Sequence, residues 1–225
     1  KKATKVFNSV FNKYDIMNDL MSLGIHRLWK QRFIEWMNPK KGDLLIDMAA
    51  GTGDIANAFL RRIKNQGHVS CVDPNKLMIE QGKKKLKYLS NIQWHISSAE
   101  NLPFKDNIFD IYSVSFGVRN FSDTQKALRE AHRVLKSGGR FICLEFSKVE
   151  NEILNKIYKT YSKTIPFLGK YIVGDSEPYD YLIKTIDEFY DQESFKKIIL
   201  NNGFNNVEYR NLSGGVVAIH SAWKV

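Results

Sequence analysis

A short apolar run followed by a glycine-rich loop constrains the fold of this chain more than any other feature of its 225 residues. Residues 44–48 read Leu-Leu-Ile-Asp-Met, and Gly51-Thr52-Gly53 follows two residues later. Glycines here let the chain turn sharply out of a buried strand and bring its backbone close to a ligand. Phe59, Leu60 and Ile63 then fall at helical spacing. The segment therefore predicts a strand, a ligand-binding turn and a helix whose first amides are unpaired.

The same alternation continues along the chain and predicts an α/β domain with a mostly parallel sheet. After a helical, aromatic-rich insert, one helix and two strands close the chain. Ser213-Gly214-Gly215 between these two strands predicts an antiparallel hairpin. The seven expected strands lie at residues 44–48, 69–73, 92–96, 109–115, 140–146, 207–212 and 216–223. After the first helix, further helices are expected at residues 77–89, 122–135 and 192–202.

Length and composition indicate a single domain. A chain of this size with 43% hydrophobic residues can bury a sizeable core and is not disordered. No apolar run approaches the ~18–20 residues of a membrane span. We divide the domain into residues 1–40 as an N-terminal helical cover, 41–149 as a cofactor-binding core, 150–190 as a helical substrate lid, and 191–225 as the final helix and hairpin.

Two cofactors fit the glycine loop on its own. The pattern Gly51-x-Gly53-x-x-Ala56 also matches the dinucleotide fingerprint, and Asp73 could accept hydrogen bonds from the ribose of either cofactor. The terminal hairpin and the Ser98-Ala99 loop after the third strand are typical of class I methyltransferases and favour S-adenosylmethionine over NAD. Asp47 and Asp54 near the loop also suit a sulfonium cation better than a pyrophosphate.

Several segments carry patterns that are not general to such a fold. On these segments the chain closely resembles, nearly from end to end, the ubiquinone/menaquinone biosynthesis C-methyltransferase family. That family methylates a ring carbon of a polyprenyl benzoquinol or naphthoquinol. The segments are Tyr14-Asp15-Ile16-Met17-Asn18, Gly24-Ile25-His26-Arg27-Leu28-Trp29-Lys30, Phe116-Gly117-Val118-Arg119-Asn120, Leu144-Glu145-Phe146-Ser147-Lys148 and Gly214-Gly215-Val216-Val217-Ala218-Ile219-His220.

The resemblance implies a class I, Rossmann-like fold that binds S-adenosylmethionine. Gly51 and Gly53 of the glycine loop are expected to contact the cofactor. The resemblance implies further cofactor contacts from Thr52, Asp73, Ser98, Ala99 and Ser115. The family usually has Gly where this chain has Ala50, which predicts that Ala50 avoids positive φ.

Ring methylation needs a route for a phenolic proton, whose ordinary pKa is about 10. Arg119 and Asn120 follow the fourth strand, at the sheet edge where ligands bind. A guanidinium is a poor base, but it can hold a phenolate or orient a water that Asn120 positions. The resemblance supports this catalytic role for both residues. The alternative is an arginine that pairs locally.

Three further residues are candidates near the site. His26 could be a base, although its place beside Trp29 in a helical pattern favours a structural role. The resemblance places N-terminal helices over the site, so Tyr14 and Asp15 are expected to face the cofactor or substrate, with a structural role as an equal alternative. The chemistry requires no metal, and no metal-ligand spacing appears.

The net charge of +10 is concentrated in three places. Residues 1–41 hold nine Lys or Arg against three Asp or Glu, a lysine cluster spans residues 83–87, and the insert adds more. This distribution fits an anionic membrane better than a nucleic acid. We expect the insert to line a groove for the polyprenyl tail, with its lysines toward headgroups: Lys156, Lys159, Lys163 and Lys170.

Other functions remain open from the sequence. They are methylation of another lipid or small molecule, a non-catalytic quinol-binding subunit, and an RNA methyltransferase with a continuous basic face. The expected partners are a polyprenyl quinol, an anionic membrane, and a second copy or a quinone-biosynthesis complex, without nucleic acid. The expected location is the cytoplasmic face of a bacterial membrane or the matrix side of the mitochondrial inner membrane.

Overall fold

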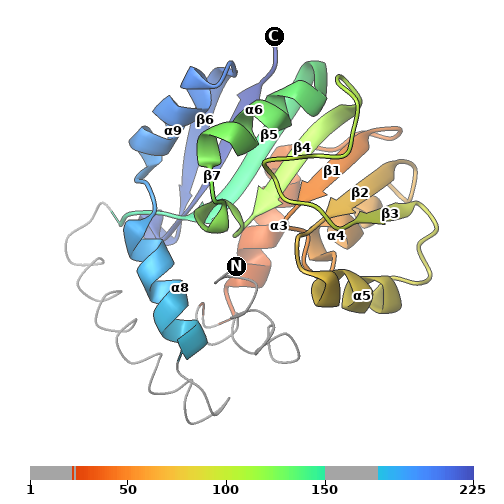
Figure 1. Cartoon of the computed structure of the whole chain (residues 1–225), viewed down its shortest axis with the longest axis horizontal. Helices are drawn as coiled ribbons and strands as arrows, with labels where there is room; N and C mark the ends of the chain where they lie inside the picture. Colours follow the sequence, from red (N-terminus) through yellow and green to blue (C-terminus); the bar gives the residue numbers. More distant parts are fainter. Residues whose placement is uncertain (1–21, 23, 150–176) are drawn as a thin grey trace.

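The computed structural model describes residue 22, residues 24–149 and residues 177–225. It contains a seven-stranded sheet in the order β3-β2-β1-β4-β5-β7-β6 (Figure 1). Neighbouring strands from β3 through β5 pair in parallel, whereas β7 runs antiparallel to both β5 and β6. The predicted parallel sheet with a terminal hairpin is therefore confirmed. The strands are β1 Leu44–Met48, β2 His68–Val72, β3 Ile92–His95, β4 Phe109–Ser115, β5 Leu135–Phe146, β6 Asn205–Leu212 and β7 Val217–Trp223.

Helices cover both faces of the sheet. In Figure 1, α6 and α9 lie in front of the sheet, while α3 and α4 lie behind it. The apolar sides of α3, α4 and α8 share one buried cluster, and those of α6 and α9 share the other. The helices are α3 His26–Met37, α4 Asp54–Arg62, α5 Lys76–Lys85, α6 Thr124–Val134, α8 Glu177–Glu188 and α9 Gln192–Asn201, with single turns η2 Val118–Asn120 and η3 Ser213–Gly215.

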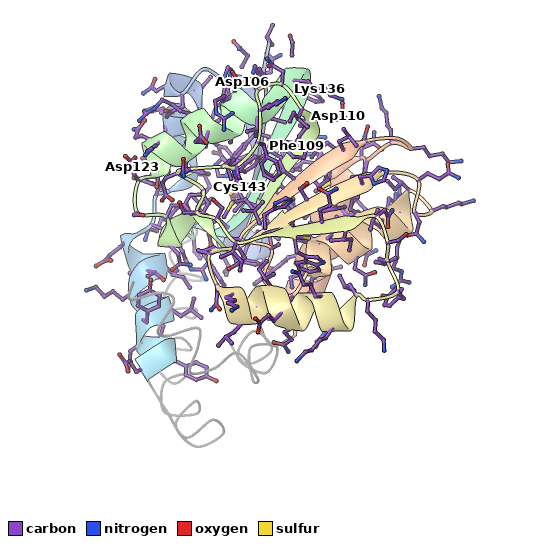
Figure 2. The ribbon with its side chains drawn as sticks, turned by 45° about the vertical axis from the view of Figure 1, so that its right-hand side comes forward. Asp106, Phe109, Asp110, Asp123, Lys136 and Cys143 are labelled. Carbon is purple, nitrogen blue, oxygen red and sulfur yellow. The ribbon has the colours of Figure 1, made fainter. Side chains whose placement is uncertain are left out.

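The fifth strand begins at Leu135, five residues before the expected start, and this boundary prediction was wrong. The Gly138-Gly139 pair, which precedes the expected start of the strand, is hydrogen-bonded to the C-terminal segment. The Gly138 N–H donates to the Lys224 carbonyl at 2.7 Å, and the Lys224 N–H donates to the Gly139 carbonyl at 2.9 Å. Figure 2 shows Lys136 beside Asp110, and their side chains form an ion pair at 2.7 Å. These contacts hold the early part of β5 against its neighbours.

Local capping explains where two helices begin. The Asn75 side chain accepts hydrogen bonds from the amides of Leu77 and Met78, so α5 starts at Lys76. The Asp123 carboxylate accepts one from the Lys126 amide, so α6 starts at Thr124 rather than at residue 122. Helix α5 ends at Lys85, four residues earlier than expected, because Leu86 leaves helical geometry with ψ 26°.

Parts of two predicted regions lie outside the described residues. These parts are residues 1–21, with Tyr14 and Asp15, and residues 150–176, with the four lysines of the insert. The last part of the expected lid is α8, which buries Tyr179, Leu182 and Ile186. The division of the domain into cover, core and lid stays a prediction. Within the described ranges, every helix is too short or too polar to cross a bilayer.

Candidate active site

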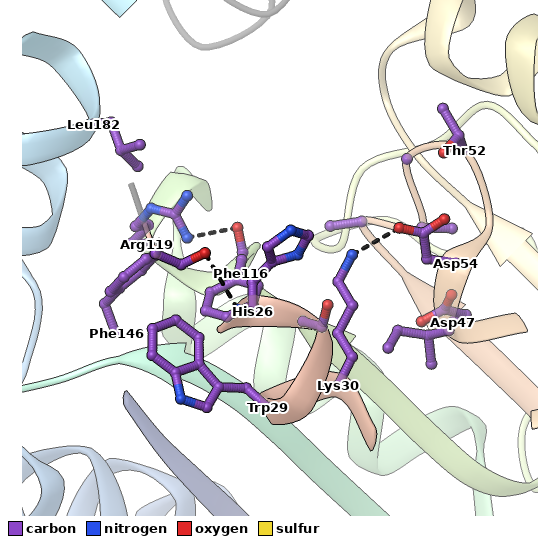
Figure 3. Close-up of a pocket in the computed structure, with 16 residues that line it drawn as sticks. His26, Trp29, Lys30, Asp47, Thr52, Asp54, Phe116, Arg119, Phe146 and Leu182 are labelled. Atoms are coloured by element: carbon purple, nitrogen blue, oxygen red, sulfur yellow. Dashed lines mark hydrogen bonds and ion pairs between the residues drawn. The ribbon is translucent and has the colours of Figure 1, made fainter. Parts of the chain in front are cut away.

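Two adjoining pockets lie at the carboxyl ends of the central strands. The first, which we call the Asp73 pocket, extends from Asp73 past Ser98 and Ala99 to Ser122. The second, the Arg119 pocket, is enclosed by α3, the glycine loop, the end of β4 and α8 (Figure 3). The two pockets share four lining residues, which are Ala49, Gly51, Ser115 and Phe116. The two pockets therefore adjoin at these residues.

Two of the shared residues adopt left-handed backbone conformations. Ala49 has φ 55° directly after β1, and Phe116 has φ 54° directly after β4. Such conformations cost a non-glycine residue about 1–3 kcal/mol and cluster at functional sites. Ala50 has no positive φ, as its replacement of glycine predicts, but the strain falls on its neighbour Ala49. Gly117 is required beside it, because a Cβ there would lie 2.5 Å from the Ala49 Cβ.

Asp73 is oriented toward the first pocket by two backbone amides. Its Oδ2 accepts from the Gly51 N–H at 2.9 Å, and its Oδ1 accepts from the Asn75 N–H at 2.8 Å. Burial raises the pKa of this carboxyl, while the two amides oppose that rise. Each oxygen has a further lone pair for a ligand hydroxyl. The arrangement suits the two adjacent hydroxyls of a ribose.

Arg119 forms a buried ion pair that the sequence analysis did not identify. Its Nη1 donates to Glu145 Oε1 at 2.7 Å and to the Phe116 carbonyl at 2.6 Å. The side chains of Arg119 and Glu145 are only 4% and 1% exposed. Glu145 sits near the end of β5, in a stretch from Phe141 to Phe146 that is otherwise apolar, and a lone acid in such a run was the signal available. The Arg119 Nε is buried without a hydrogen-bond partner among the described residues.

Three aromatic rings form one wall of the Arg119 pocket. Phe116 and Phe146 have ring centroids 5.0 Å apart, and Trp29 lies 6.2 Å from each of them. The Trp29 Nε1 donates to Ser213 Oγ at 2.9 Å, which fixes the indole against the turn of the terminal hairpin. The Arg119 guanidinium lies 5.4 Å from the Phe146 ring centroid. The wall offers flat apolar surface beside a cation, which suits a phenolic ring.

Two acids near the glycine loop have pKa values that are shifted in opposite directions. Asp47 is 1% exposed, and burial raises its pKa to about 7 although Ser113 donates to its Oδ1. Its Oδ2 is without a partner in the described part of the chain. Burial would also raise the pKa of Asp54, but Lys30 and Lys85 outweigh that effect and hold the pKa well below its usual value. Each lysine lies 2.7 Å from an Asp54 oxygen. Asp47 therefore remains available to a cationic ligand, whereas Asp54 is already neutralised.

The expected site residues divide between the two pockets. Ser98, Ala99, Asp73 and Asn120 line the Asp73 pocket, Thr52 and Arg119 line the Arg119 pocket, and Gly51 and Ser115 line both. Arg119 and Asn120, adjacent in sequence, thus face different pockets. The Asn120 Oδ1 accepts instead from the Tyr181 hydroxyl of α8 at 3.0 Å.

Gly53 lines neither pocket and has a packing role. It precedes α4 with φ 85°, and a Cβ there would lie 2.8 Å from the Leu86 and Trp94 side chains. His26, in contrast, lines the Arg119 pocket, although the sequence favoured a structural role for it. Tyr14 and Asp15 lie outside the described residues. Within the described ranges no cluster of three or more His, Cys, Asp or Glu side chains could hold a metal ion.

The fold and the two-pocket site define a class I methyltransferase. An S-adenosylmethionine-dependent methyltransferase from Aquifex aeolicus matches with a TM-score of 0.66 at 18% identity, over 87% of this chain and 89% of that chain. Phosphoethanolamine N-methyltransferase 2 of Haemonchus contortus, solved with S-adenosylhomocysteine, matches with a TM-score of 0.65 at 14% identity, over 87% of this chain and 52% of that chain. These likenesses concern the fold.

Sequence similarity identifies the family. The chain belongs to the ubiE/COQ5 methyltransferase family, which matches residues 1–224. Ubiquinone/menaquinone biosynthesis C-methyltransferase UbiE of Ruegeria sp. (strain TM1040) is 48% identical over 224 residues, which cover 98% of this chain and 89% of that protein. The mitochondrial 2-methoxy-6-polyprenyl-1,4-benzoquinol methylase of Bos taurus is 44% identical over 261 residues, which cover 100% of this chain and 79% of that protein.

Proposed function

We propose that this protein transfers a methyl group from S-adenosylmethionine to a ring carbon of a polyprenyl benzoquinol or demethylmenaquinol. The observation that carries the proposal is the aromatic wall beside Arg119, in a pocket continuous with the Asp73 pocket. The two arrangements suit a phenolic ring and a nucleoside, respectively. The names of the relatives from Ruegeria and Bos taurus agree with this substrate class.

The residues present fit the cofactor. Asp73 would hold the ribose hydroxyls, with Ser98 and Ala99 beside the base. The unpartnered Oδ2 of Asp47 would accept from the ammonium group of the methionine portion. When bound, S-adenosylmethionine supplies an electrophilic methyl group on a sulfonium centre. Because two lysines already pair with Asp54, Asp47 is the acid among the described residues of this part of the pocket that is left for that ammonium.

Arg119 and the aromatic wall would orient the acceptor ring. Trp29, Phe116 and Phe146 present ring faces and edges that favour a planar substrate. The unpartnered Arg119 Nε can donate to a phenolic oxygen and stabilise the negative charge that develops on it. Glu145 fixes the guanidinium from behind, so no reorganisation is needed when the charge appears.

The direct experiment measures methyl transfer to demethylated benzoquinol and naphthoquinol acceptors in parallel. Arg119→Ala should reduce turnover at least ~100-fold with unchanged cofactor affinity, because it removes charge stabilisation at the acceptor. Arg129→Ala is the matched control, since Arg129 is an exposed arginine on α6. Full activity of Arg119→Ala on both quinols, or no transfer by the wild-type protein, would reject the proposal.

We also propose peripheral contact with an anionic membrane, on the cytoplasmic side in bacteria or the matrix side in mitochondria. A groove between α3 and α4 opens beside the Arg119 pocket and shares His26, Lys30 and Asp54 with it. Its other basic residues are Arg27, Arg61, Arg62 and Lys85. Arg61 and Arg62 are exposed and form no ion pair with a described acid, so they can bind lipid phosphates.

Vesicle flotation tests this contact. Arg61→Glu/Arg62→Glu should lose most binding to phosphatidylglycerol vesicles at low salt, whereas Lys196→Glu/Lys197→Glu on α9 makes the same charge change elsewhere and should keep it. An equal loss of vesicle binding in both double variants would indicate that only the net charge matters. That result would contradict binding through the groove between α3 and α4. Activity on a short-tailed quinol in detergent should be unchanged in either pair.

A further inference from the structure

In the Arg119 pocket, Arg119 provides a hydrogen-bond donor for the quinol oxygen. The proton that this oxygen loses must go to a different group. A guanidinium carries N–H donors and has no acceptor atom. Arg119 Nη1 is already bound to Glu145 and the Phe116 carbonyl, and Nε is buried without a described partner. This geometry favours an oxygen that has lost its proton. A water molecule or another side chain of the pocket must therefore take that proton.

The described residues of this pocket include five side chains with an acidic, basic or imidazole group: His26, Lys30, Asp47, Asp54 and Arg119. Lys30 and Asp54 are joined in an ion pair at 2.7 Å, and both Asp54 oxygens are bound to lysines. Asp47 lies at the end of β1, near the glycine loop, on the side assigned to the cofactor. Glu145 is behind Arg119 and does not line the pocket. His26 is the described group that remains.

His26 is placed between the two halves of the pocket. It is the first residue of α3 and is 6% exposed, and its backbone N–H donates to Ser22 Oγ at 3.2 Å. Figure 3 shows the imidazole between Arg119 and Phe116 on one side and Lys30 with Asp54 on the other. His26 and the three aromatic rings line the same pocket, so a quinol ring packed on the aromatic wall would share that pocket with the imidazole.

We propose that His26 is the catalytic base that accepts the quinol proton while Arg119 holds the oxygen; the inference rests on the proposed function. The O–H bond breaks, an N–H bond forms on the imidazole, and the oxygen electron pair moves into the ring. The ring carbon takes the methyl group as the bond from sulfur to that methyl breaks. Loss of the proton from that carbon restores the aromatic ring and the oxygen is reprotonated, so one proton is released per methyl transferred.

Among the described residues, the charged groups around the pocket allow His26 to gain a charge. Arg119 is neutralised by Glu145, and Lys30 is neutralised by Asp54. Lys85, on the far side of Asp54, adds one positive charge at a more exposed position. Proton transfer from the quinol creates an imidazolium and a phenolate together, so the net charge of the pocket does not change in that step.

The test compares His26→Gln with His132→Gln, a histidine on α6 that packs against Phe204 outside both pockets. At pH 7, His26→Gln should lower kcat at least ~100-fold, the usual range for a general base. Its affinity for S-adenosylmethionine by calorimetry should match the wild type. His132→Gln should retain wild-type kcat.

Two further measurements separate catalysis from structure. The deficit of His26→Gln should shrink as pH approaches ~10, where the phenol ionises unaided, and with a fluorinated quinol whose hydroxyl ionises near neutral pH. A kcat within threefold of wild type, or a deficit equal at every pH and with both acceptors, would overturn the role of His26. His26→Asn should reproduce the result and serves if the glutamine variant does not fold. An inactive wild-type protein would instead reject the proposed function itself.

Discussion

The buried Arg119–Glu145 pair makes a quantitative prediction for Glu145→Ala. Glu145 accepts from Arg119 Nη1 at 2.7 Å, from the Arg119 amide at 3.4 Å and from the Phe146 amide at 2.9 Å. The two side chains are 4% and 1% exposed, so water cannot replace the lost partner. Leaving one buried charge unpaired costs about 3–5 kcal/mol. For a domain of this size that cost corresponds to a fall in Tm of roughly 6–20 °C.

Urea unfolding followed by tryptophan fluorescence measures this cost. The double variant Arg119→Met/Glu145→Leu removes both charges and should be more stable than Glu145→Ala, because replacing a whole buried pair by apolar side chains is often close to neutral. Glu145→Gln keeps the shape and should lower kcat with little effect on cofactor affinity. A loss below about 1 kcal/mol in Glu145→Ala would refute the reasoning, since it would mean that the pair is solvated.

Three other predictions concern Asp73, Asp47 and Gly53. Asp73→Ala should weaken S-adenosylmethionine binding about 100-fold, from the loss of two hydrogen bonds to a charged group, and calorimetry showing unchanged affinity would exclude the ribose role. Burial raises the pKa of Asp47 to about 7. Between about pH 4 and 7, Asp47 is therefore protonated in the native state without cofactor but ionised in the unfolded chain. The contribution of Asp47 to stability therefore falls as pH rises through that window. Asp47→Asn should show a smaller fall in Tm over this pH range than the wild type. Parallel curves of Tm against pH for the two proteins would contradict this prediction. Gly53→Ala should destabilise the fold by about 2 kcal/mol, because φ is 85° and the new Cβ would lie 2.8 Å from Leu86 and Trp94; a denaturation midpoint equal to wild type would argue against this packing role.

Much of the sheet was predictable, because strand and helix periods are local properties of the sequence. The strands at residues 44–48 and 109–115 have the predicted bounds, and the hairpin after α9 forms as expected. The start of β5 was not predictable, because it depends on contacts with Lys224, almost ninety residues away along the chain. The glycines do interrupt the pairing with β4, since Gly138 has φ 76° and the register shifts there, but the strand itself extends back to Leu135.

The positions of Asp73 and Arg119 at the pockets were predictable, because both residues follow the end of a strand, and their roles stay predictions. What the sequence could not give is how neighbouring side chains are paired. Glu145 stood out only as part of a motif, and its contact with Arg119 joins β5 to the η2 turn. Asp47 and Asp54 looked equivalent as nearby acids, but the lysines that neutralise Asp54 come from α3 and α5. Such differences arise from packing between elements and not from spacing along the chain.

The most direct measurement places the transferred methyl group. The protein would be incubated with S-adenosylmethionine carrying a 13C-labelled methyl group and with demethylated quinol, and the product would be examined by NMR. We expect the label on a ring carbon next to a hydroxyl, with at least one of the benzoquinol and naphthoquinol acceptors. Label on a quinol oxygen, or on neither acceptor, would contradict ring methylation in the Arg119 pocket.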